Sequence, residues 1–73
     1  MKLTPTSGRE LCKIVEKLGF VRVRQTGSHI RYEHPDGRKT TIPLHGNEEI
    51  GKGLLLEILH QIKLSRDEFL KLR

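Results

Sequence analysis

The sequence of 73 residues contains one cysteine and no long apolar run, and each of these shortages excludes a class of protein. A single thiol cannot form an internal disulfide. Cys12 lies at the edge of an apolar helical stripe, so we expect it to pack in the core and not to act in redox or nucleophilic chemistry. Without a long apolar run, neither a signal peptide nor a membrane-spanning helix is indicated, and we expect a cytoplasmic protein without a membrane partner.

Sequence signatures of metal and nucleotide sites are missing as well. No cysteine and histidine residues have the spacing of zinc ligands, no carboxylate cluster suits Mg²⁺, and no glycine-rich phosphate loop precedes a helix. We therefore expect no metal and no other cofactor. A chain of this length buries only about 60% of its unfolded surface and forms one domain at most. We assign residues 1–73 to a single domain with a loose N-terminal segment at 1–6, and we expect a shallow site.

Acidic residues are fewer than basic residues. The chain has 14 lysine and arginine residues against 9 aspartate and glutamate residues, which gives a net charge of +5 and an isoelectric point near 9.8. This balance favours a polyanionic partner, because contacts with phosphates release condensed counterions. Nucleic acid is the first candidate. An anionic membrane is the second, but neither long predicted helix combines a basic face with a face of bulky apolar residues.

The first helix is predicted directly after Ser7. Ser7 and Glu10 fit a capping box, in which each side chain accepts from the backbone N–H of the other residue. Apolar residues then recur at helical spacing and form one stripe, which consists of Leu11, Ile14, Val15 and Leu18. Gly19 can take the left-handed conformation that closes a helix, so we place the end of this helix at Leu18.

Strands follow, because the apolar period changes to two in residues 20–24 and 29–33. A two-residue hairpin turn at Gly27-Ser28 would pair Thr26 with His29, Arg24 with Arg31, and Arg22 with Glu33. A three-residue loop at 35–37, with its glycine left-handed, adds a third strand. This loop would pair Ile30 with Ile42, Tyr32 with Thr40, and Glu33 with Lys39.

Two more helices are predicted after a loop at residues 45–49 (HGNEE). The second helix contains the apolar set Leu55, Ile58, Leu59 and Ile62. A second capping box at Ser65 and Glu68, with a hydrophobic staple between Leu64 and Phe69, predicts a short third helix. The chain is therefore predicted to be an α+β protein. Its three-stranded antiparallel sheet carries helices on one face, in the order αβββα plus a short C-terminal helix.

The other face of this sheet is predicted to be polar and basic. It would carry Arg22, Arg24, Thr26, His29, Arg31, Glu33, Lys39 and Thr41. One interpretation is a solvated surface on which Glu33 pairs with Lys39 and Arg22. Against this interpretation, Arg24 lies directly opposite Arg31, and like charges so placed destabilise a sheet unless an anion lies between them. A phosphate would satisfy both arginines.

His29 is the only one of the four histidines that the predicted register places on this face. Arg24 and Arg31 disfavour the imidazolium and so keep the ring available as a base. The turn beside it supplies Gly27, which lets a backbone approach closely, and the hydroxyl and amide of Ser28. RNA brings its own nucleophile, the 2′-OH, so a shallow basic surface with one base could cleave RNA without a metal.

The other histidines have structural interpretations. His34 is predicted to be an edge residue on the helix-facing side of the sheet, and His60 to be solvated on the outer side of the second helix. His45 follows the third strand, close to His29. It either caps the loop that follows or serves as an auxiliary group at the site, and we favour the structural role.

Residues 18–46 read LGFVRVRQTGSHIRYEHPDGRKTTIPLHG, and GKG and LSRDEFL follow downstream. With its Gly-Ser-His, PDG turn and Pro-x-His, this sequence resembles the HicA toxins of prokaryotic toxin–antitoxin pairs over about residues 7–72. The resemblance implies a fold like that of the double-stranded-RNA-binding domain and translation-independent cleavage of messenger RNA. It also implies that His29 is the catalytic histidine, that Gly27 and Ser28 accompany it, and that a HicB antitoxin blocks the toxin.

The second helix departs from the pattern of these relatives. Leu54 and Leu56 stand where relatives commonly have a polar and a basic residue, which predicts a more apolar flank for antitoxin or oligomer contacts. Lys63 replaces a glycine that would end the helix in the left-handed conformation.

Our first hypothesis is an endoribonuclease, an mRNA interferase toxin, in which His29 takes the proton of the 2′-OH. The predicted RNA-binding residues are Arg22, Arg24, Gly27, Ser28, Arg31 and Lys39, of which Arg24, Arg31 and Lys39 hold phosphates. The alternative is a non-catalytic RNA-binding module on the same fold. A third hypothesis is an interaction domain that binds an acidic protein through the basic face.

Overall fold

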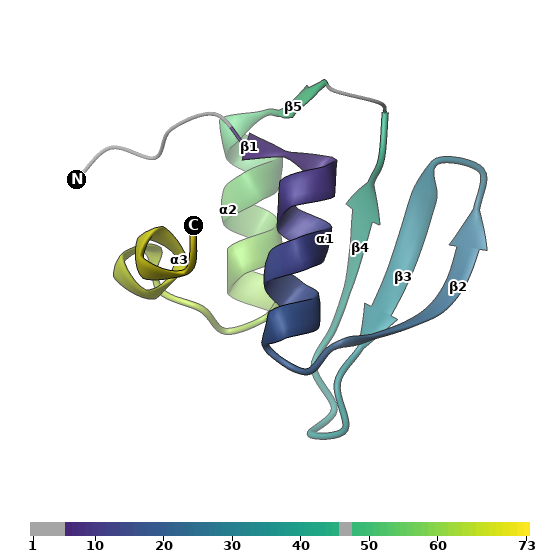
Figure 1. The fold of residues 1–73 in the computed structure, drawn as a ribbon, viewed down its shortest axis with the longest axis horizontal. Helices are drawn as coiled ribbons and strands as arrows, with labels where there is room; N and C mark the ends of the chain where they lie inside the picture. The colour runs from purple at the N-terminus through teal and green to yellow at the C-terminus, as the bar shows by residue number, and fades with distance from the viewer. Residues whose placement is uncertain (1–5, 46–47) are drawn as a thin grey trace.

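The structure, a computed structural model, describes residues 6–45 and 48–73. Its elements are β1 (Thr6–Ser7), α1 (Gly8–Lys17), β2 (Val21–Thr26), β3 (His29–Glu33), β4 (Lys39–Pro43), β5 (Glu49–Ile50), α2 (Lys52–Gln61) and α3 (Arg66–Leu72). Strands β2, β3 and β4 form an antiparallel sheet in that spatial order. Helices α1 and α2 lie on one side of the sheet, and α3 lies at the end of the molecule away from the strands (Figure 1). This arrangement confirms the predicted α+β fold, which is similar to the double-stranded-RNA-binding domain.

Buried apolar side chains from the sheet and all three helices form one core cluster. On α1 these are the predicted stripe residues Leu11, Ile14 and Val15, with Leu18 partly buried beside them. On and just after α2 they are Leu55, Ile58, Leu59 and Ile62. Cys12 is buried in the same cluster, as expected for a packing role. Each fully buried aliphatic side chain stabilises the fold by about 1.5–3 kcal/mol, so this cluster holds the helices on the sheet.

Both ends of α1 use the residues predicted for them. The Ser7 side chain accepts from the backbone N–H of Glu10 at 3.1 Å, but the Glu10 carboxylate accepts from the Arg73 guanidinium at 2.6 Å instead of completing the capping box. At the other end, Gly19 has a φ of 98°, and the N–H of Phe20 donates to the carbonyl of Val15. These bonds satisfy carbonyls that a helix end leaves without a partner.

The β2–β3 hairpin has the predicted turn but not the whole predicted register. Thr26 lies opposite His29 and Arg24 opposite Arg31, as expected. A bulge between Arg22 and Arg24 then shifts the pairing, so that Arg22 faces Tyr32 and Val21 faces Glu33. The predicted pair of Arg22 and Glu33 is therefore wrong. Val23 is the extra residue of the bulge, and a bulge of one residue moves every residue beyond it to the other face.

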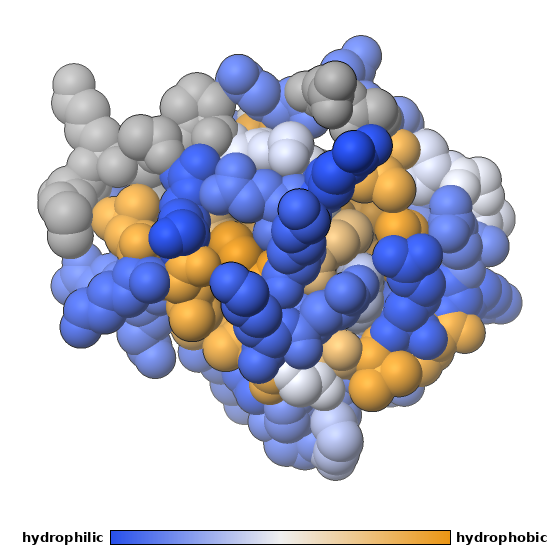
Figure 2. Space-filling view, in the orientation of Figure 1, coloured by the Kyte–Doolittle hydropathy of each residue, from blue (hydrophilic) through white to orange (hydrophobic). Residues whose placement is uncertain are grey.

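The bulge brings Arg22 next to the hydroxyl of Tyr32, whose ring is fully buried. The Tyr32 hydroxyl donates to the Glu16 carboxylate, and the Arg22 guanidinium reaches both groups, at 3.4 Å from the hydroxyl and 3.7 Å from the carboxylate. A regular strand would turn Arg22 away from them. The cost is that Val21 and Val23 are 55% and 50% exposed, and hydrophobic side chains reach the surface over the start of β2 (Figure 2).

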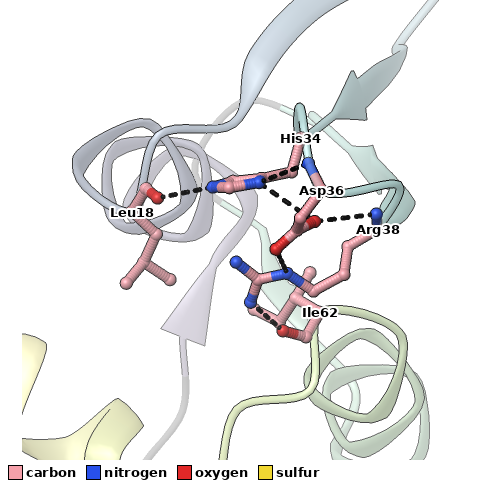
Figure 3. Close-up of polar contacts among 5 residues, drawn as sticks. All are labelled: Leu18, His34, Asp36, Arg38 and Ile62. Carbon is pink, nitrogen blue, oxygen red and sulfur yellow. Dashed lines mark hydrogen bonds and ion pairs between the residues drawn. The ribbon is translucent and has the colours of Figure 1, made fainter.

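The second hairpin agrees with the prediction throughout. Ile30 pairs with Ile42, Tyr32 with Thr40 and Glu33 with Lys39, and the loop between the strands has Gly37 at a φ of 100°. His34 anchors this loop to α1 (Figure 3). Its Nδ1 accepts from the Asp36 N–H at 3.1 Å, and its Nε2 lies 3.2 Å from the carbonyl of Leu18. The structural role predicted for His34 is confirmed.

The loop also reaches α2, through Arg38. The Arg38 guanidinium donates to the Ile62 carbonyl at 2.6 Å and to the Asp36 carboxylate at 2.8 Å (Figure 3). Hydrogen bonds from the Arg38 backbone N–H and side chain lower the pKa of Asp36. The PDG turn therefore connects the sheet to the C-terminal ends of both long helices.

A second, two-stranded pairing was not predicted from the sequence. β1 pairs with β5, with Thr6 opposite Ile50 and Ser7 opposite Glu49. Thr6, which we assigned to a loose segment, is 1% exposed, and Glu49, which we assigned to a loop, lies in a strand. His45 and Glu48 lie outside helices and strands, as the predicted loop requires, and residues 1–5 and 46–47 lie outside the described residues.

The joint between α2 and α3 forms without a glycine. Lys63 itself takes the left-handed conformation, with a φ of 55°, and the N–H of Leu64 donates to the Leu59 carbonyl. The predicted capping box follows: Ser65 accepts from the Glu68 N–H at 3.1 Å, and the Glu68 carboxylate accepts from the Ser65 N–H at 3.3 Å. Phe69 is fully buried, as the staple predicted.

Candidate functional site

An open hollow of about 800 Å³ lies beside β4. One wall consists of side chains from β3 and β4, including His29 and Arg31, and the other consists of residues 48–51 and one face of α2. The sequence predicted a shallow surface on the sheet alone. The hollow is instead formed jointly by the edge of the sheet and the second helix.

His29 occupies the first position of β3, at the rim of this hollow, and its side chain is exposed. Gly27 in the preceding turn has a φ of 60°, a conformation that glycine adopts at little cost. The carbonyl of Ser28 accepts from the N–H of Leu44 at 2.6 Å. This bond ties the turn before His29 to the end of the third strand, so the position of His29 is fixed relative to the residues that follow β4.

His45 is brought directly to His29 by that connection. The centroids of the two imidazole rings are 5.9 Å apart, and the rings are perpendicular. Both side chains are exposed and both line the hollow. Of the two interpretations of His45 that the sequence left open, this geometry supplies what an auxiliary group needs, namely a second imidazole facing the same space.

The basic residues predicted around His29 do not all surround the hollow. Arg31 and Lys39 line it, whereas Arg24 lies across the ladder from Arg31 and is not among the described residues that line it. Arg31 also lies 3.7 Å from the Glu33 carboxylate. Because both side chains are more than 40% exposed, this ion pair is weak and leaves Arg31 able to exchange it for a phosphate.

Arg22 lies elsewhere. The bulge turns it to the helix-facing side, where it contacts Tyr32 and Glu16. The prediction that Arg22 belongs to the open face with His29 is therefore wrong, because the extra residue Val23 reverses its orientation. Its role in RNA binding stays a prediction, but Arg22 does not lie on the same surface as His29.

The far wall of the hollow contains polar residues that we did not predict. Glu48, Glu49 and Glu57 line it, as does Gln61. Gln61 accepts a hydrogen bond of 2.7 Å from the hydroxyl of Thr40, a residue that is 3% exposed. The spacing of Glu57 and Gln61, four residues apart on one helix, was visible in the sequence, but nothing local indicated that this helical face lies against β4.

Cys12 and Tyr32 lie in the core, away from the hollow. Burial raises the pKa of the Cys12 thiol. Burial also raises the pKa of Tyr32, and the hydrogen bond to Glu16 adds to this increase. His60 is exposed, as predicted. In residues 6–45 and 48–73, no group of three or more histidine, cysteine, aspartate or glutamate side chains is arranged to hold a metal ion. No helix in the same ranges is long and apolar enough to cross a bilayer.

A comparison with models of protein families gives a match. The model of the family described as the HicA toxin of bacterial toxin–antitoxin systems matches residues 8–64, which include the whole three-stranded sheet, both histidines at the hollow and α2. No curated protein matches the chain.

Proposed function

Because the chain belongs to the HicA family, and is thus the toxin of a toxin–antitoxin pair, we propose that it is an endoribonuclease that cleaves messenger RNA without a metal ion. The observation that carries this proposal is the pair of exposed imidazoles, 5.9 Å apart, on a hollow that is also lined by Arg31 and Lys39. Cleavage of RNA at its own 2′-OH needs a base, an acid and positive charge near the phosphate, and these four side chains provide them.

In this mechanism His29 accepts the proton of the 2′-OH. The 2′-oxygen attacks the adjacent phosphorus, the bond from phosphorus to the 5′-oxygen breaks, and a 2′,3′-cyclic phosphate forms. The leaving 5′-oxygen needs a proton, and His45 donates it from the other side of the phosphate. Arg31 and Lys39 stabilise the negative charge that develops on the phosphoryl oxygens.

The partners follow from the same proposal. Membership of the family implies pairing with an antitoxin. We propose that this antitoxin is a HicB-like protein and that it acts on the surface that contains His29, since covering the hollow would exclude RNA. Messenger RNA is the proposed substrate, because the hollow is open and the middle of a single-stranded segment can enter it. A deep pocket would admit only the end of an RNA strand.

The test is cleavage of a single-stranded RNA by the purified chain in excess EDTA. We expect cleavage to persist and the upstream products to end in 2′,3′-cyclic phosphates, which resist a phosphatase until acid opens them. Activity that disappears in EDTA and returns with Mg²⁺ would overturn the mechanism. RNA binding without any cleavage would favour the non-catalytic RNA-binding module.

A further inference from the structure

The part of the lining formed by residues 48–51 and α2 is acidic. Glu48, Glu49 and Glu57 all line it, and they share one open space of about 800 Å³ with the basic side chains of the sheet. Carboxylates repel phosphates, so this wall cannot serve the RNA backbone that Arg31 and Lys39 attract. A part of the substrate that carries hydrogen-bond donors and no negative charge suits this wall, and the bases of RNA fit that description.

Glu57 and Gln61 form a directional pair on this wall. They lie four residues apart on α2, so their side chains are neighbours on one helical face. The buried hydroxyl of Thr40 donates to the Oε1 of Gln61 at 2.7 Å, which occupies the oxygen of the amide and leaves its two N–H groups as donors. The hollow therefore presents a carboxylate acceptor next to an amide donor whose orientation is fixed from inside the core.

An apolar surface accompanies this pair. Leu54, which is 44% exposed, lines the same hollow together with Pro43 and Ile58. A planar base can lie against such side chains while its edge reaches Glu57 and Gln61. The volume is within the usual range of about 300–1,000 Å³ for ligand pockets, so one base and its sugar fit with the phosphate at the opposite wall.

We propose that this wall is a base-recognition subsite that selects guanine next to the phosphate at His29. The inference rests on the proposed function, whose site it extends. The Watson–Crick edge of guanine has two adjacent donors, N1–H and the N2 amino group, followed by the O6 acceptor. The Glu57 carboxylate accepts from both donors, and the Gln61 amide donates to O6. No other base in RNA offers donors on two neighbouring positions of this edge to one carboxylate, so Glu57 is the specificity-determining residue.

Binding of nucleoside 3′-monophosphates tests the subsite without relying on cleavage. Each of the four 3′-nucleotides is titrated into the full chain, and backbone amide shifts are followed by NMR. We expect 3′-GMP to bind at least about fivefold more tightly than the other three, which is the lower bound of what one bidentate contact discriminates, and to shift the amides of Glu57 and Gln61. Glu57→Gln should remove this preference. Asp67→Asn, which removes an equal charge from the exposed surface of α3, should leave it unchanged.

Cleavage provides the second measurement. Oligonucleotides that differ only in the nucleotide at one position are compared, and wild-type protein is expected to cut fastest next to guanine. Glu57→Gln should flatten this preference to within about twofold of the other bases. Equal thermal midpoints of the two proteins would confirm that the exposed substitution leaves the fold intact.

The outcomes separate this inference from the proposed function. Selective binding of 3′-GMP by a chain that cuts no RNA supports the subsite and overturns the endoribonuclease. Cleavage without a preference that depends on Glu57, together with equal binding of all four nucleotides, overturns the subsite and leaves the endoribonuclease standing. If Glu57→Gln weakens only the affinity for the antitoxin, the acidic wall is a protein contact and the proposal is wrong.

Discussion

His29 combines an exposed side chain with a well-fixed backbone. It follows a glycine turn, begins a strand of the sheet, and lies beside the Ser28 carbonyl, which accepts from the N–H of Leu44 at 2.6 Å. Removing its ring opens no cavity in the core, because the core cluster does not include it. At this residue an effect on the proposed cleavage and an effect on folding can therefore be separated by experiment.

We predict that His29→Ala abolishes cleavage while the protein stays folded. Loss of a general base costs about 10²- to 10⁴-fold in rate, whereas an exposed substitution of this kind changes stability by only about 0.5 kcal/mol. Thermal midpoint, RNA affinity and cleavage rate should be measured on one preparation of each protein. A folded variant that still cuts at near the wild-type rate would remove His29 from the mechanism, and an unfolded one would make it a structural residue.

His45 should lose its importance when the leaving group needs no proton. We predict that His45→Ala slows cleavage of RNA at least about 10²-fold. On a nucleoside 3′-(4-nitrophenyl phosphate) the variant should retain most of the wild-type rate, because an aryl oxide departs without an acid. His29→Ala should be slow on both substrates, which makes it the matched comparison. Equal losses for His45→Ala on the two substrates would show that His45 is not the general acid.

At the scale of elements, α1 and α2 are both followed by a residue in the left-handed conformation, which is a glycine after α1 and a lysine after α2. Gly19 and Lys63 both have a positive φ, at 98° and 55°, and both precede a residue whose N–H returns to the helix. Glycine takes this conformation freely, whereas for a residue with a Cβ it costs about 1–2 kcal/mol. A Cβ at position 19 would also lie 3.1 Å from the Nε2 of His34.

Opposite changes in stability are therefore expected at these two positions. Lys63→Gly should stabilise the chain by about 0.5 kcal/mol, because relief of the left-handed strain exceeds the added entropy of the unfolded chain. Gly19→Ala should destabilise it by about 1 kcal/mol or more. Urea unfolding of both variants measures the difference. A destabilising effect of Lys63→Gly would mean that the lysine side chain contributes more than its backbone costs.

The elements that the sequence predicted well are those set by local chemistry. The Gly27-Ser28 and PDG turns, the capping box at Ser65 and the stripe of α1 depend on residues within a few positions of one another, and all are present. The bulge at Val23 escaped prediction because the contacts that accompany it are distant in the sequence: Arg22 joins Tyr32 on the next strand and Glu16 on α1. The pairing of β1 with β5 escaped for the same reason, since α1 and the whole three-stranded sheet separate its two strands in the sequence.

At the scale of the whole molecule, the net charge of +5 is distributed over separate surfaces, and the share at the hollow is smaller than the sequence suggested. Arg31 and Lys39 line the hollow, Arg24 lies next to Arg31, and Arg22 and Arg38 are engaged in the fold. His29 and its turn could be identified from the sequence. The proximity of His45 also followed from the predicted pairing of the second and third strands, whereas the acidic wall could not be predicted, because it depends on how β4 and α2 meet.

Salt dependence of RNA binding tests this distribution. We predict that Arg24→Ala or Arg31→Ala weakens binding to single-stranded RNA and lowers the slope of log affinity against log salt by roughly 0.7 for each phosphate that the variant no longer neutralises. Arg22→Ala, on the helix-facing side, should leave the slope unchanged. Binding measured at several salt concentrations gives the slopes. If Arg22→Ala lowers the slope and the other two do not, RNA follows the opposite side of the sheet.

The outer edge of β2 also affects how the protein behaves in concentrated solution. β2 lies at the edge of its sheet, and the exposed valines at 21 and 23 give that edge the composition of a strand that can pair with another chain. The bulge and the arginines at 22 and 24 oppose such pairing, since a kinked, positively charged edge repels its own copy. Screening or neutralising those charges weakens this protection, so colloidal stability should be greatest at low ionic strength and should fall as polyanions are added.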